Sequence, residues 1–361
     1  MTLAIAEARK GIGKTSPNPS VGAVIVKEGE VIAKGYHEKA GMAHAEVRAI
    51  ENAGCSLKGA TIYVTLEPCS HTGKTPPCCR ALVENGFARV VIGMLDPNPL
   101  VNGRGIQYLQ DHGVEVDSGV LAQECEALNY PFIKHIRSGL PWVIMKAGIS
   151  LDGRINYQQG KSGWITGEEV GYEVHKIRDS VDAIMVGSNT VKIDNPSLTT
   201  RLPGNQDGKD PIRIVIDSNL SLSPLAKIFH LNSKAPTWVI CSTDVTQQQV
   251  EIFLELGVKI IQVPTSENGL DLNTALLELG REDVCSVLVE GGSALHGSLL
   301  REQLYDYAHL FYAPIFAGDA GVPLVSGVSV RGKEGAPRLI SPQRKQLGED
   351  LQLSGRLAYG R

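Results

Sequence analysis

The first 140 residues alternate between short continuous apolar runs and segments in which apolar residues recur every three or four positions. Short apolar runs favour buried strands, and the longer period favours helices. Strands are therefore predicted at 21–26, in a segment ending near 36, at 61–66 and at 89–93, and helices up to about residue 12, at 43–53 and at 78–84. This order predicts a sheet covered by helices, with its functional site at strand ends and helix N-termini.

The pattern changes around residues 130–141, where Gly139-Leu140-Pro141 interrupts it. We predict a domain boundary there, with a first domain at residues 1–140 and a second at 141–361. The second domain alternates again, which predicts an α/β fold with a large sheet. Its strands are expected at 142–146, 183–187, 212–216, 237–241, 259–263, 286–289, 306–311 and 350–357, and its helices at 168–179, 246–256, 272–280 and 294–303.

Composition narrows the class of protein. The chain has 361 residues, 42% of them apolar and 20% charged, which is typical of a folded globular protein. A net charge of −4 argues against a nucleic-acid-binding protein, and no apolar run approaches the roughly 18 residues that cross a bilayer. Without a secretion signal the seven cysteines do not indicate a disulfide framework, so a cytoplasmic location is expected. Four of them are expected to be buried small hydrophobic residues: Cys55, Cys125, Cys241 and Cys285.

Three potential metal ligands and one carboxylate lie at predicted element ends of the first half. His44, Cys69 and Cys78 offer an imidazole and two thiolates, which can hold a zinc ion and leave one position open for water. Glu46 is placed to transfer protons rather than to coordinate the metal. The pattern H-x-E, then P-C and a later cysteine, is the signature of zinc deaminases. The sequence therefore predicts a site that removes an amine from a ring by hydrolysis.

A structural zinc site is an alternative for the same residues. Structural sites use four protein ligands, and only three have suitable spacing here. Cys79 or His71 could supply a fourth. We expect Cys79 to pack in the core instead, because it points elsewhere on its helix than its neighbour Cys78.

The second half carries one candidate anion site. Residues 287–297 are predicted to form a strand, a glycine turn and a helix, whose free N–H groups can bind a dinucleotide phosphate. A plain glycine-rich turn explains this sequence equally well. Arg178 and Arg201 could bind a phosphate, although a surface arginine is more often simply solvated.

Several motifs taken together resemble one family. They are Ser16-Pro17-Asn18-Pro19, His44-Ala45-Glu46 and the run from Pro68 to Cys78 in the first half, and Lys146 to Arg154, Trp164-Ile165-Thr166, Asp194-Asn195-Pro196 and Glu290-Gly291-Gly292 in the second. The chain resembles the bifunctional deaminase–reductases of riboflavin biosynthesis over nearly its whole length. The resemblance implies an N-terminal cytidine-deaminase-like three-layer α/β/α domain and a C-terminal dihydrofolate-reductase-like α/β domain. One small departure is Lys74, where many relatives have arginine.

The resemblance also implies two consecutive reactions. The first is zinc-dependent hydrolytic deamination of 2,5-diamino-6-(5-phosphoribosylamino)pyrimidin-4(3H)-one to the corresponding aminouracil. The second is reduction of the ribosyl group to a ribityl chain by NADPH. The deaminase substrate would contact Asn18, His37, His71 and Lys74, the last two within the long insertion between the cysteines.

In the reductase half the resemblance points to Lys146 and Asp194 as the groups that polarise the opened sugar and handle its proton. The implied cofactor-binding residues are Gly148, Trp164, Thr190, Asp194, Gly292, Ser293, Ala294, Leu295, His296, Gly297 and Ser298. The implied substrate-binding residues are Ser162, Arg178, Leu198, Arg201 and Glu290.

A nucleic-acid base deaminase is the competing interpretation, since it shares the zinc ligands and the glutamate. The acidic balance, 5% aromatic residues and the attached α/β half speak against it. We therefore expect one zinc ion per chain, NADPH and a phosphorylated pyrimidine as partners, no nucleic acid or membrane, and a homo-oligomer.

Overall fold

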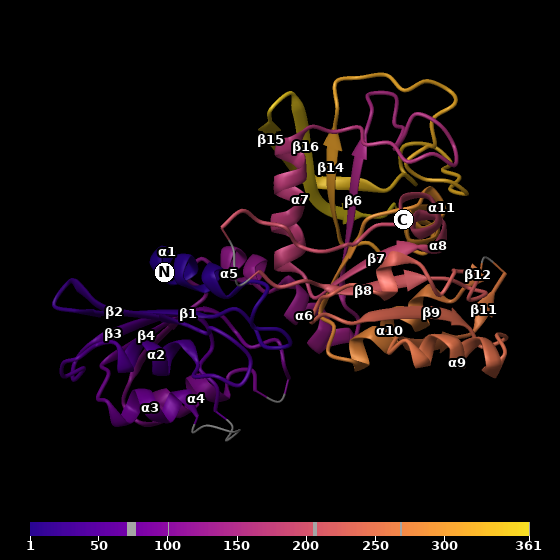
Figure 1. Cartoon of the computed structure of the whole chain (residues 1–361). Helices are drawn as coiled ribbons and strands as arrows, with labels where there is room; N and C mark the ends of the chain where they lie inside the picture. Colours follow the sequence, from indigo (N-terminus) through magenta and orange to yellow (C-terminus); the bar gives the residue numbers. More distant parts are fainter. Residues whose placement is uncertain (71–76, 100, 205–207, 268, 361) are drawn as a thin grey trace. The chain divides into compact units, whose positions relative to one another are not determined.

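The chain divides into two compact units, Met1–Gly139 and Leu140–Arg361. A computed structural model describes residues 1–70, 77–99, 101–204, 208–267 and 269–360 (Figure 1).

The first unit is built on a five-stranded sheet in the order β2-β1-β3-β4-β5. β1 runs antiparallel to β2 and β3, whereas β3, β4 and β5 are parallel. The strands are β1 (Gly22–Lys27), β2 (Glu30–Tyr36), β3 (Thr61–Leu66), β4 (Arg89–Met94) and β5 (Glu115–Ser118). The continuous apolar run Val90-Val91-Ile92 fits this fold because helices bury both faces of the sheet.

Helices form a layer on each side of this sheet. α1 (Thr2–Ala8) packs with α5 (Ala122–Leu128) on one face, and α2 (Ala45–Glu51), α3 (Cys78–Glu84) and α4 (Arg104–Asp111) follow one another on the other (Figure 1). The expected three-layer α/β/α domain is confirmed. A 3-10 turn (Arg9–Gly11) extends α1, and α6 (Tyr130–Ser138) ends the unit.

One glycine brings the functional end of α2 close to the sheet. A Cβ at Gly35 of β2 would collide with the main chain of Ala45 and Ala49 in α2. Without that side chain the helix lies directly on the strand, and its first residues follow His44.

One expectation about the cysteines is wrong. Cys125, Cys241 and Cys285 are buried as expected, but Cys55 is exposed. It lies in a bend after α2, between Gly54 and Ser56, which are exposed as well.

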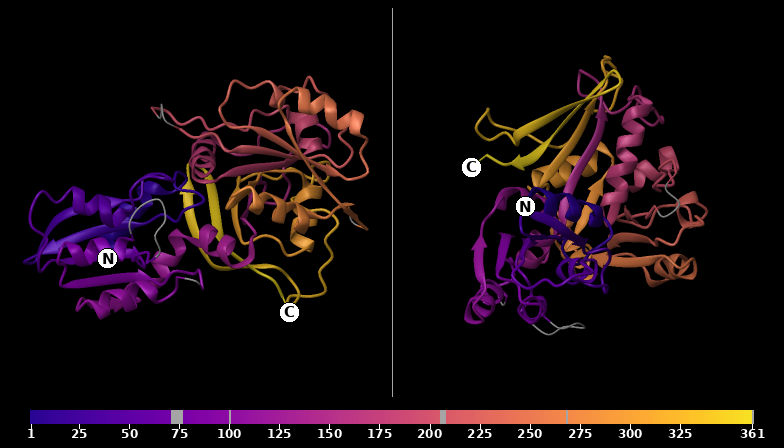
Figure 2. Two further views of the ribbon diagram at one scale, coloured as in Figure 1. Left: turned by 90° about the horizontal axis from the view of Figure 1, so that it is seen from below. Right: turned by 90° about the vertical axis from the view of Figure 1, so that its left-hand side faces the viewer.

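The second unit is built on a nine-stranded sheet in the order β10-β9-β8-β7-β13-β6-β14-β16-β15. Its strands from β10 to β14 in that order are parallel, and β16 and β15 add an antiparallel hairpin at one edge (Figure 2). The bounds are β6 (Trp142–Ile149), β7 (Ala183–Gly187), β8 (Ile212–Ile216), β9 (Thr237–Ser242), β10 (Lys259–Val263), β13 (Ser286–Val289), β14 (Tyr307–Tyr312), β15 (Arg338–Leu347) and β16 (Asp350–Ala358). Two short strands, β11 (Thr265–Ser266) and β12 (Gly269–Leu270), pair separately.

Alternating side chains of these strands enter cores on opposite faces. Ala183 and Met185 pack with α10 (Leu272–Arg281) and α11 (Ser293–Arg301), whereas Ile184 and Val186 pack with α8 (Ser188–Asp194) and α9 (Gln247–Glu255). In a further hydrophobic cluster, α7 (Glu168–Ser180) packs against Leu288 and Phe311. A 3-10 turn (Lys227–Phe229) completes the unit. This arrangement confirms the expected second α/β domain with a large sheet.

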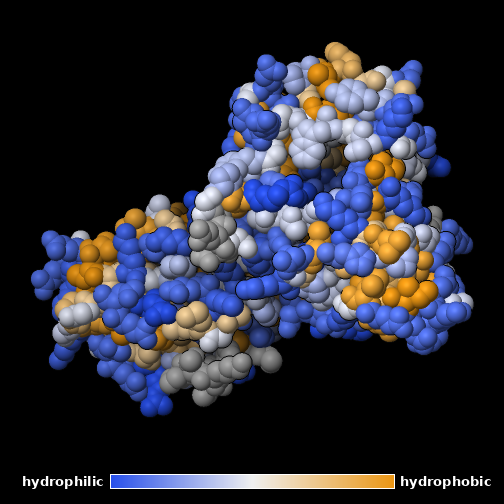
Figure 3. All heavy atoms as spheres, viewed as in Figure 1, coloured by the Kyte–Doolittle hydropathy of each residue, from blue (hydrophilic) through white to orange (hydrophobic). Residues whose placement is uncertain are grey.

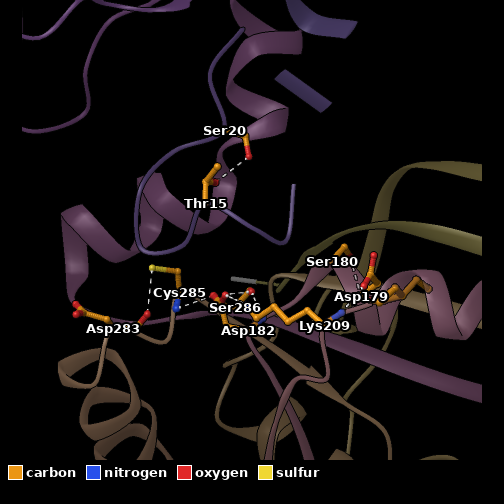
Figure 4. A network of polar contacts seen from close by, with 10 residues as sticks. Thr15, Ser20, Asp179, Ser180, Asp182, Lys209, Asp283, Cys285 and Ser286 are labelled. Carbon is orange, nitrogen blue, oxygen red and sulfur yellow. Dashed lines mark hydrogen bonds and ion pairs between the residues drawn. The ribbon is translucent and has the colours of Figure 1, made fainter. Parts of the chain in front are cut away.

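A buried carboxylate fixes the register of β7 against β13. Asp182 Oδ2 accepts hydrogen bonds from the main-chain N–H groups of Cys285 and Ser286, at 3.1 and 3.0 Å, and from Ser286 Oγ at 3.0 Å (Figure 4). Lys209 Nζ lies 3.5 Å from the other oxygen of Asp182. Because both strands are tied at their starts, their ends are also aligned, and Glu290 follows the end of β13.

The face of the molecule shown in Figure 3 is largely hydrophilic, and its apolar side chains gather in several groups between the charged ones. Within the described part of the chain, no helix is both long enough and apolar enough to cross a membrane.

Candidate functional site

The three predicted zinc ligands come together in the first unit. His44 precedes α2, Cys69 follows β3 and Cys78 is the first residue of α3. Their ligand atoms all lie within 4.8 Å of one another. His44 is the N-cap of α2, one residue before the helical turn in which the sequence places it. Its extended backbone (φ −70°, ψ 163°) leads into the helix from the loop rather than continuing the helical path.

The spacing of these atoms fits zinc. His44 Nδ1 lies 3.1 Å from Cys78 Sγ and 3.6 Å from Cys69 Sγ. Tetrahedral zinc with ordinary Zn–N and Zn–S bonds separates such atoms by about 3.6 Å. The N–H of Cys78 donates to Cys69 Sγ at 3.3 Å, and hydrogen bonds from Cys78 and His44 lower the pKa of the Cys69 thiol to about 4. This donor set therefore suits a zinc ion through His44 Nδ1 and two thiolates.

Glu46 lies beside these ligands and is buried, with 3% of its surface exposed. Burial raises the pKa of its carboxyl to about 7, and the neighbouring Cys69 thiolate adds to the rise. A carboxyl with a pKa near neutrality can both take up and release a proton, which suits general acid–base catalysis.

Two of the four expected substrate contacts lie at the same site. Asn18 Nδ2 lies 3.2 Å from His37 Nε2, and His37 Nδ1 lies 3.1 Å from the carbonyl oxygen of Ala43. The His37 and His44 rings meet edge to face, with centroids 5.6 Å apart. His71 and Lys74, the other two expected contacts, lie outside the described residues.

Cys79, which could have been a fourth ligand of a structural site, packs in the hydrophobic core of the first unit. Among the described residues, the cluster suited to a metal has three members, and Cys79 is not one of them. His71, the other candidate for a fourth ligand, lies outside the described residues. Three protein ligands would leave a position for water, as in catalytic zinc sites.

Sequence analysis did not identify one residue of the first unit that supports the metal-binding segment. Glu67, directly before Pro68-Cys69, is buried and accepts hydrogen bonds from the N–H groups of Asp96, Gly103 and Gly105 at 3.2, 3.0 and 3.0 Å. A Cβ at Gly105 would collide with the carbonyl oxygen of Pro68. Glu67 thereby anchors the segment that carries Cys69. The one sequence feature that could have indicated this residue is its position at the end of a predicted strand, next to the segment with the metal ligand Cys69.

The second unit brings Lys146, Arg178 and Glu290 together. Arg178 Nε and Nη2 contact the two carboxylate oxygens of Glu290 at 2.6 and 2.8 Å, and Lys146 Nζ lies 3.5 Å from Glu290 Oε2. Lys146 comes from β6, Arg178 from α7 and Glu290 from the end of β13. Lys146 Nζ also lies 5.9 Å from the centroid of the Trp164 ring. Three predicted site residues from distant parts of the sequence therefore share one charged network.

An open pocket of about 440 Å³ adjoins this network. Trp164, Arg201 and His175 are among the residues that line it, together with Thr166, Gly167, Glu168, Gly171, Tyr172 and Pro203. Trp164 is 66% exposed, so its ring offers a large free face. Gly148 on β6 allows Thr166, another residue of the pocket wall, to lie close to the strand, because a Cβ at Gly148 would be only 3.0 Å from Thr166 Cγ2.

The glycine turn before α11 has the form expected for a cofactor phosphate. Gly291 and Gly292 pass close to Thr190 of α8, and a Cβ at Gly291 would lie 3.2 Å from Thr190 Oγ1. Ser293 opens α11, and its buried hydroxyl has no hydrogen-bond partner within the described chain. An unpaired hydroxyl at a helix N-terminus fits an anionic ligand.

The side chains of the predicted cofactor-binding segment, residues 292–298, differ in their exposure. Gly292, Ser293 and Ala294 form the start of α11, and Ala294 is exposed. Leu295 belongs to the core, and the buried His296 pairs through Nδ1 with Tyr305 Oη at 2.7 Å. Gly297 packs against the main chain of Ser326, and Ser298 Oγ accepts from Arg301. The side chains of Leu295 and His296 thus point into the protein.

The remaining predicted residues are spread around this end of the sheet. Asp194 is the exposed last residue of α8, and Ser162 is exposed before Trp164. Leu198 is buried and has a positive φ of 52°. Like the other predicted roles of site residues, these three assignments stay predictions.

Family models match both units. Residues 1–94 match the cytidine and deoxycytidylate deaminase zinc-binding region, and residues 141–353 match the RibD C-terminal domain.

Whole proteins and solved structures agree with the family models. The chain is 41% identical to the riboflavin biosynthesis protein RibD of Bacillus amyloliquefaciens (98% of this chain, 94% of the relative) and 39% identical to that of Escherichia coli (98% and 97%). It superimposes on Acinetobacter baumannii RibD with a TM-score of 0.88 at 35% identity, covering 100% of this chain and 98% of the other. It superimposes on a diaminohydroxyphosphoribosylaminopyrimidine deaminase/5-amino-6-(5-phosphoribosylamino)uracil reductase from Thermotoga maritima with a TM-score of 0.86 at 35% identity, covering 99% and 97%. The chain therefore belongs to the RibD family, the bifunctional deaminases and reductases of riboflavin biosynthesis.

Proposed function

We propose that the chain catalyses two consecutive steps on one phosphorylated pyrimidine. The first is hydrolysis of the 2-amino group of 2,5-diamino-6-(5-phosphoribosylamino)pyrimidin-4(3H)-one, in which water enters, ammonia leaves and the aminouracil remains. The second is reduction of the ribosyl group to a ribityl 5-phosphate with NADPH. Residues 1–140 would carry the deaminase and residues 141–361 the reductase. The relative from Thermotoga maritima is named for the same pair of activities.

In the deaminase half, His44, Cys69 and Cys78 would hold one zinc ion per chain. Zinc supplies a water molecule of lowered pKa at the open coordination position. Glu46 would take a proton from that water and return it to the departing amine, a role that its raised pKa of about 7 supports. Asn18 and His37, with His71 and Lys74, would hold the substrate.

In the reductase half, the Gly292–Ser298 segment, Gly148, Trp164, Thr190 and Asp194 would bind the cofactor, with Ser293 Oγ and the α11 N-terminus facing its phosphates. NADPH supplies the hydride, and the protein orients the two reactants. Ser162, Arg178, Leu198, Arg201 and Glu290 would hold the substrate. Lys146 would polarise the opened sugar, and Lys146 and Asp194 would handle its proton.

One observation carries this proposal above all. The same chain joins a three-ligand site with a buried carboxyl of pKa about 7 to a separate network in which Lys146 lies 3.5 Å from Glu290. The first arrangement suits hydrolytic deamination, and the second offers a cation beside an open pocket for a sugar phosphate. A nucleic-acid base deaminase would have no use for the second.

A single incubation tests both steps. The purified chain is supplied with the diaminopyrimidine substrate, first without and then with NADPH, and the products are identified by mass spectrometry. We expect ammonia release alone without NADPH, and a further gain of two hydrogens with it. Failure to release ammonia, or hydrogen uptake on the sugar without NADPH, would overturn the proposal.

The same preparation tests three finer points of the proposal. Metal analysis should give one zinc per chain, and NADPH should be oxidised faster than NADH at equal concentration. Sedimentation should give a homo-oligomer, which we propose as the cytoplasmic form. A monomer would overturn only that last point.

A further inference from the structure

Three consecutive residues at the edge of the reductase pocket are each held by a side chain from elsewhere in the unit. Arg178 Nη1 donates to the carbonyl oxygen of Thr199 at 3.0 Å, and Thr200 N donates to Asp210 Oδ1 at 2.7 Å. Arg201 N donates to His175 Nδ1 at 3.2 Å. This segment follows α8 through two residues of positive φ, Asn195 and Leu198, so its own backbone geometry is not regular. Its path therefore depends on these three partners.

The contact from Arg201 fixes the state of the His175 ring. A main-chain N–H can only donate, so Nδ1 of His175 must be unprotonated and accept. The neutral ring then carries its hydrogen on Nε2. Burial, together with the charges of Arg178 and Arg201, lowers the pKa of His175 to about 4, which keeps the ring in this state at neutral pH.

His175 and Arg178 are three residues apart on α7 and so lie on the same side of the helix. Arg178 binds both oxygens of Glu290 and also Thr199, while His175 binds the main chain of Arg201. One helical turn thus sets the spacing between Glu290 and Arg201. Both His175 and Arg201 line the open pocket with Trp164.

The guanidinium of Arg201 is available for a ligand. Its Nη1 donates to Thr199 Oγ1 at 3.2 Å, and no carboxylate of the described residues lies within ion-pair distance of it. A cation without an acidic partner at the wall of a pocket suits an anionic group such as a sugar phosphate.

We propose that His175 is a positioning residue of the reductase: through Nδ1 it holds the main chain at Arg201 and so aims the Arg201 guanidinium at the anionic end of the substrate. This inference rests on the proposed function, in which Arg201 binds the phosphorylated substrate. It adds a residue that acts through Arg201 and touches neither cofactor nor reacting atoms.

The two ring nitrogens can be tested separately by substitution. In His175→Asn the side-chain oxygen replaces Nδ1, whereas in His175→Gln the amide replaces Nε2, and His175→Leu removes both. The readout is NADPH oxidation with the aminouracil phosphate as substrate. We expect His175→Leu and His175→Gln to raise the KM for that substrate about tenfold, the effect of losing one hydrogen bond in a binding site. Their kcat and their KM for NADPH should stay within about twofold of the parent, as should every constant of His175→Asn.

Lys176→Ala is the matched control, because Lys176 neighbours His175 on α7 but faces Glu173 and Tyr172 instead. It should behave as the parent. An unchanged KM in His175→Leu, or a His175→Asn variant as impaired as His175→Leu, would overturn the inference. If His175→Leu does not fold, the comparison of the Asn and Gln variants decides in its place. A parent enzyme that does not oxidise NADPH with this substrate would instead contradict the proposed function, so the two failures are distinguishable.

Discussion

Arg178 and Glu290 form a two-point ion pair in which two of the three guanidinium nitrogens each meet one carboxylate oxygen, Nε to Oε1 at 2.6 Å and Nη2 to Oε2 at 2.8 Å. The two side chains are only 10% and 6% exposed. Burial alone would raise the pKa of the Glu290 carboxyl, but the charges of Arg178 and Lys146 outweigh it and lower that pKa to about 2. Glu290 is therefore ionised throughout the working range and fixes both cations beside the pocket.

Removing one member of this pair should destabilise the second unit more than removing both. We expect Arg178→Met to lower its free energy of unfolding by about 3–5 kcal/mol, because a buried carboxylate is left without its main partner. Arg178→Met combined with Glu290→Leu should recover a large part of that loss. Urea unfolding followed by tryptophan fluorescence measures this selectively, since all three tryptophans (Trp142, Trp164 and Trp238) lie in the second unit. If the double variant has a lower free energy of unfolding than Arg178→Met, the account is contradicted.

Glu46→Gln should abolish deamination while leaving the metal in place. The amide has nearly the same shape but cannot accept the proton of the attacking water, so the deamination rate should fall by about a hundredfold or more. Zinc content, measured by elemental analysis, should stay that of the parent because Glu46 is outside the three-ligand cluster. Loss of zinc, or a rate near the parent's, would exclude the proton-transfer role. Chelator-treated parent enzyme serves as the control and should lose deamination but still reduce the aminouracil.

Lys146→Ala should separate the two activities in the opposite sense. Lys146 Nζ lies beside Glu290 and over the Trp164 ring. Its loss removes the cation that we propose polarises the sugar, so NADPH oxidation should slow by roughly a hundredfold. Ammonia release should be unaffected, because the zinc ligands lie in the other unit. Equal loss of both activities would contradict the division of labour between the units.

Sequence patterns located most strands because those strands are buried. β3 at Thr61–Leu66 and β8 at Ile212–Ile216 coincide with the predicted ranges, and both are mostly apolar segments inside a sheet, with Arg213 as the charged residue of β8. The edge strand β15 was not predicted. It is exposed along most of its length and contains Pro342, with an irregular register nearby, so it has neither a continuous apolar run nor an alternation to recognise.

The candidate site residues also differ in whether the sequence alone could identify them. His44, Cys69 and Cys78 could be found because imidazole and thiolates at such spacing are rare without a metal. Glu67 and His175 could not, since their function lies in hydrogen bonds to main-chain N–H groups distant in sequence, at Gly103 and at Arg201. No local sequence feature distinguishes a glutamate or histidine that binds a backbone amide from one that is exposed to solvent.

His296 should make the second unit sensitive to acid. Its ring is fully buried, and burial, with the nearby charge of Lys146, lowers its pKa to about 4 from the ordinary 6.5. Because the folded state resists protonation, the unfolded state binds a proton first, and this part of the stability is complete above pH 6.5 and lost as the pH falls towards 4. The loss amounts to about 2–3 kcal/mol over that range. His296→Asn, which keeps a polar atom near Tyr305 Oη but does not titrate, should therefore lose less stability than the parent between pH 7 and pH 4.5. Urea unfolding at the two pH values, followed by tryptophan fluorescence, measures the difference; parallel losses in parent and variant would show that His296 is not the group responsible.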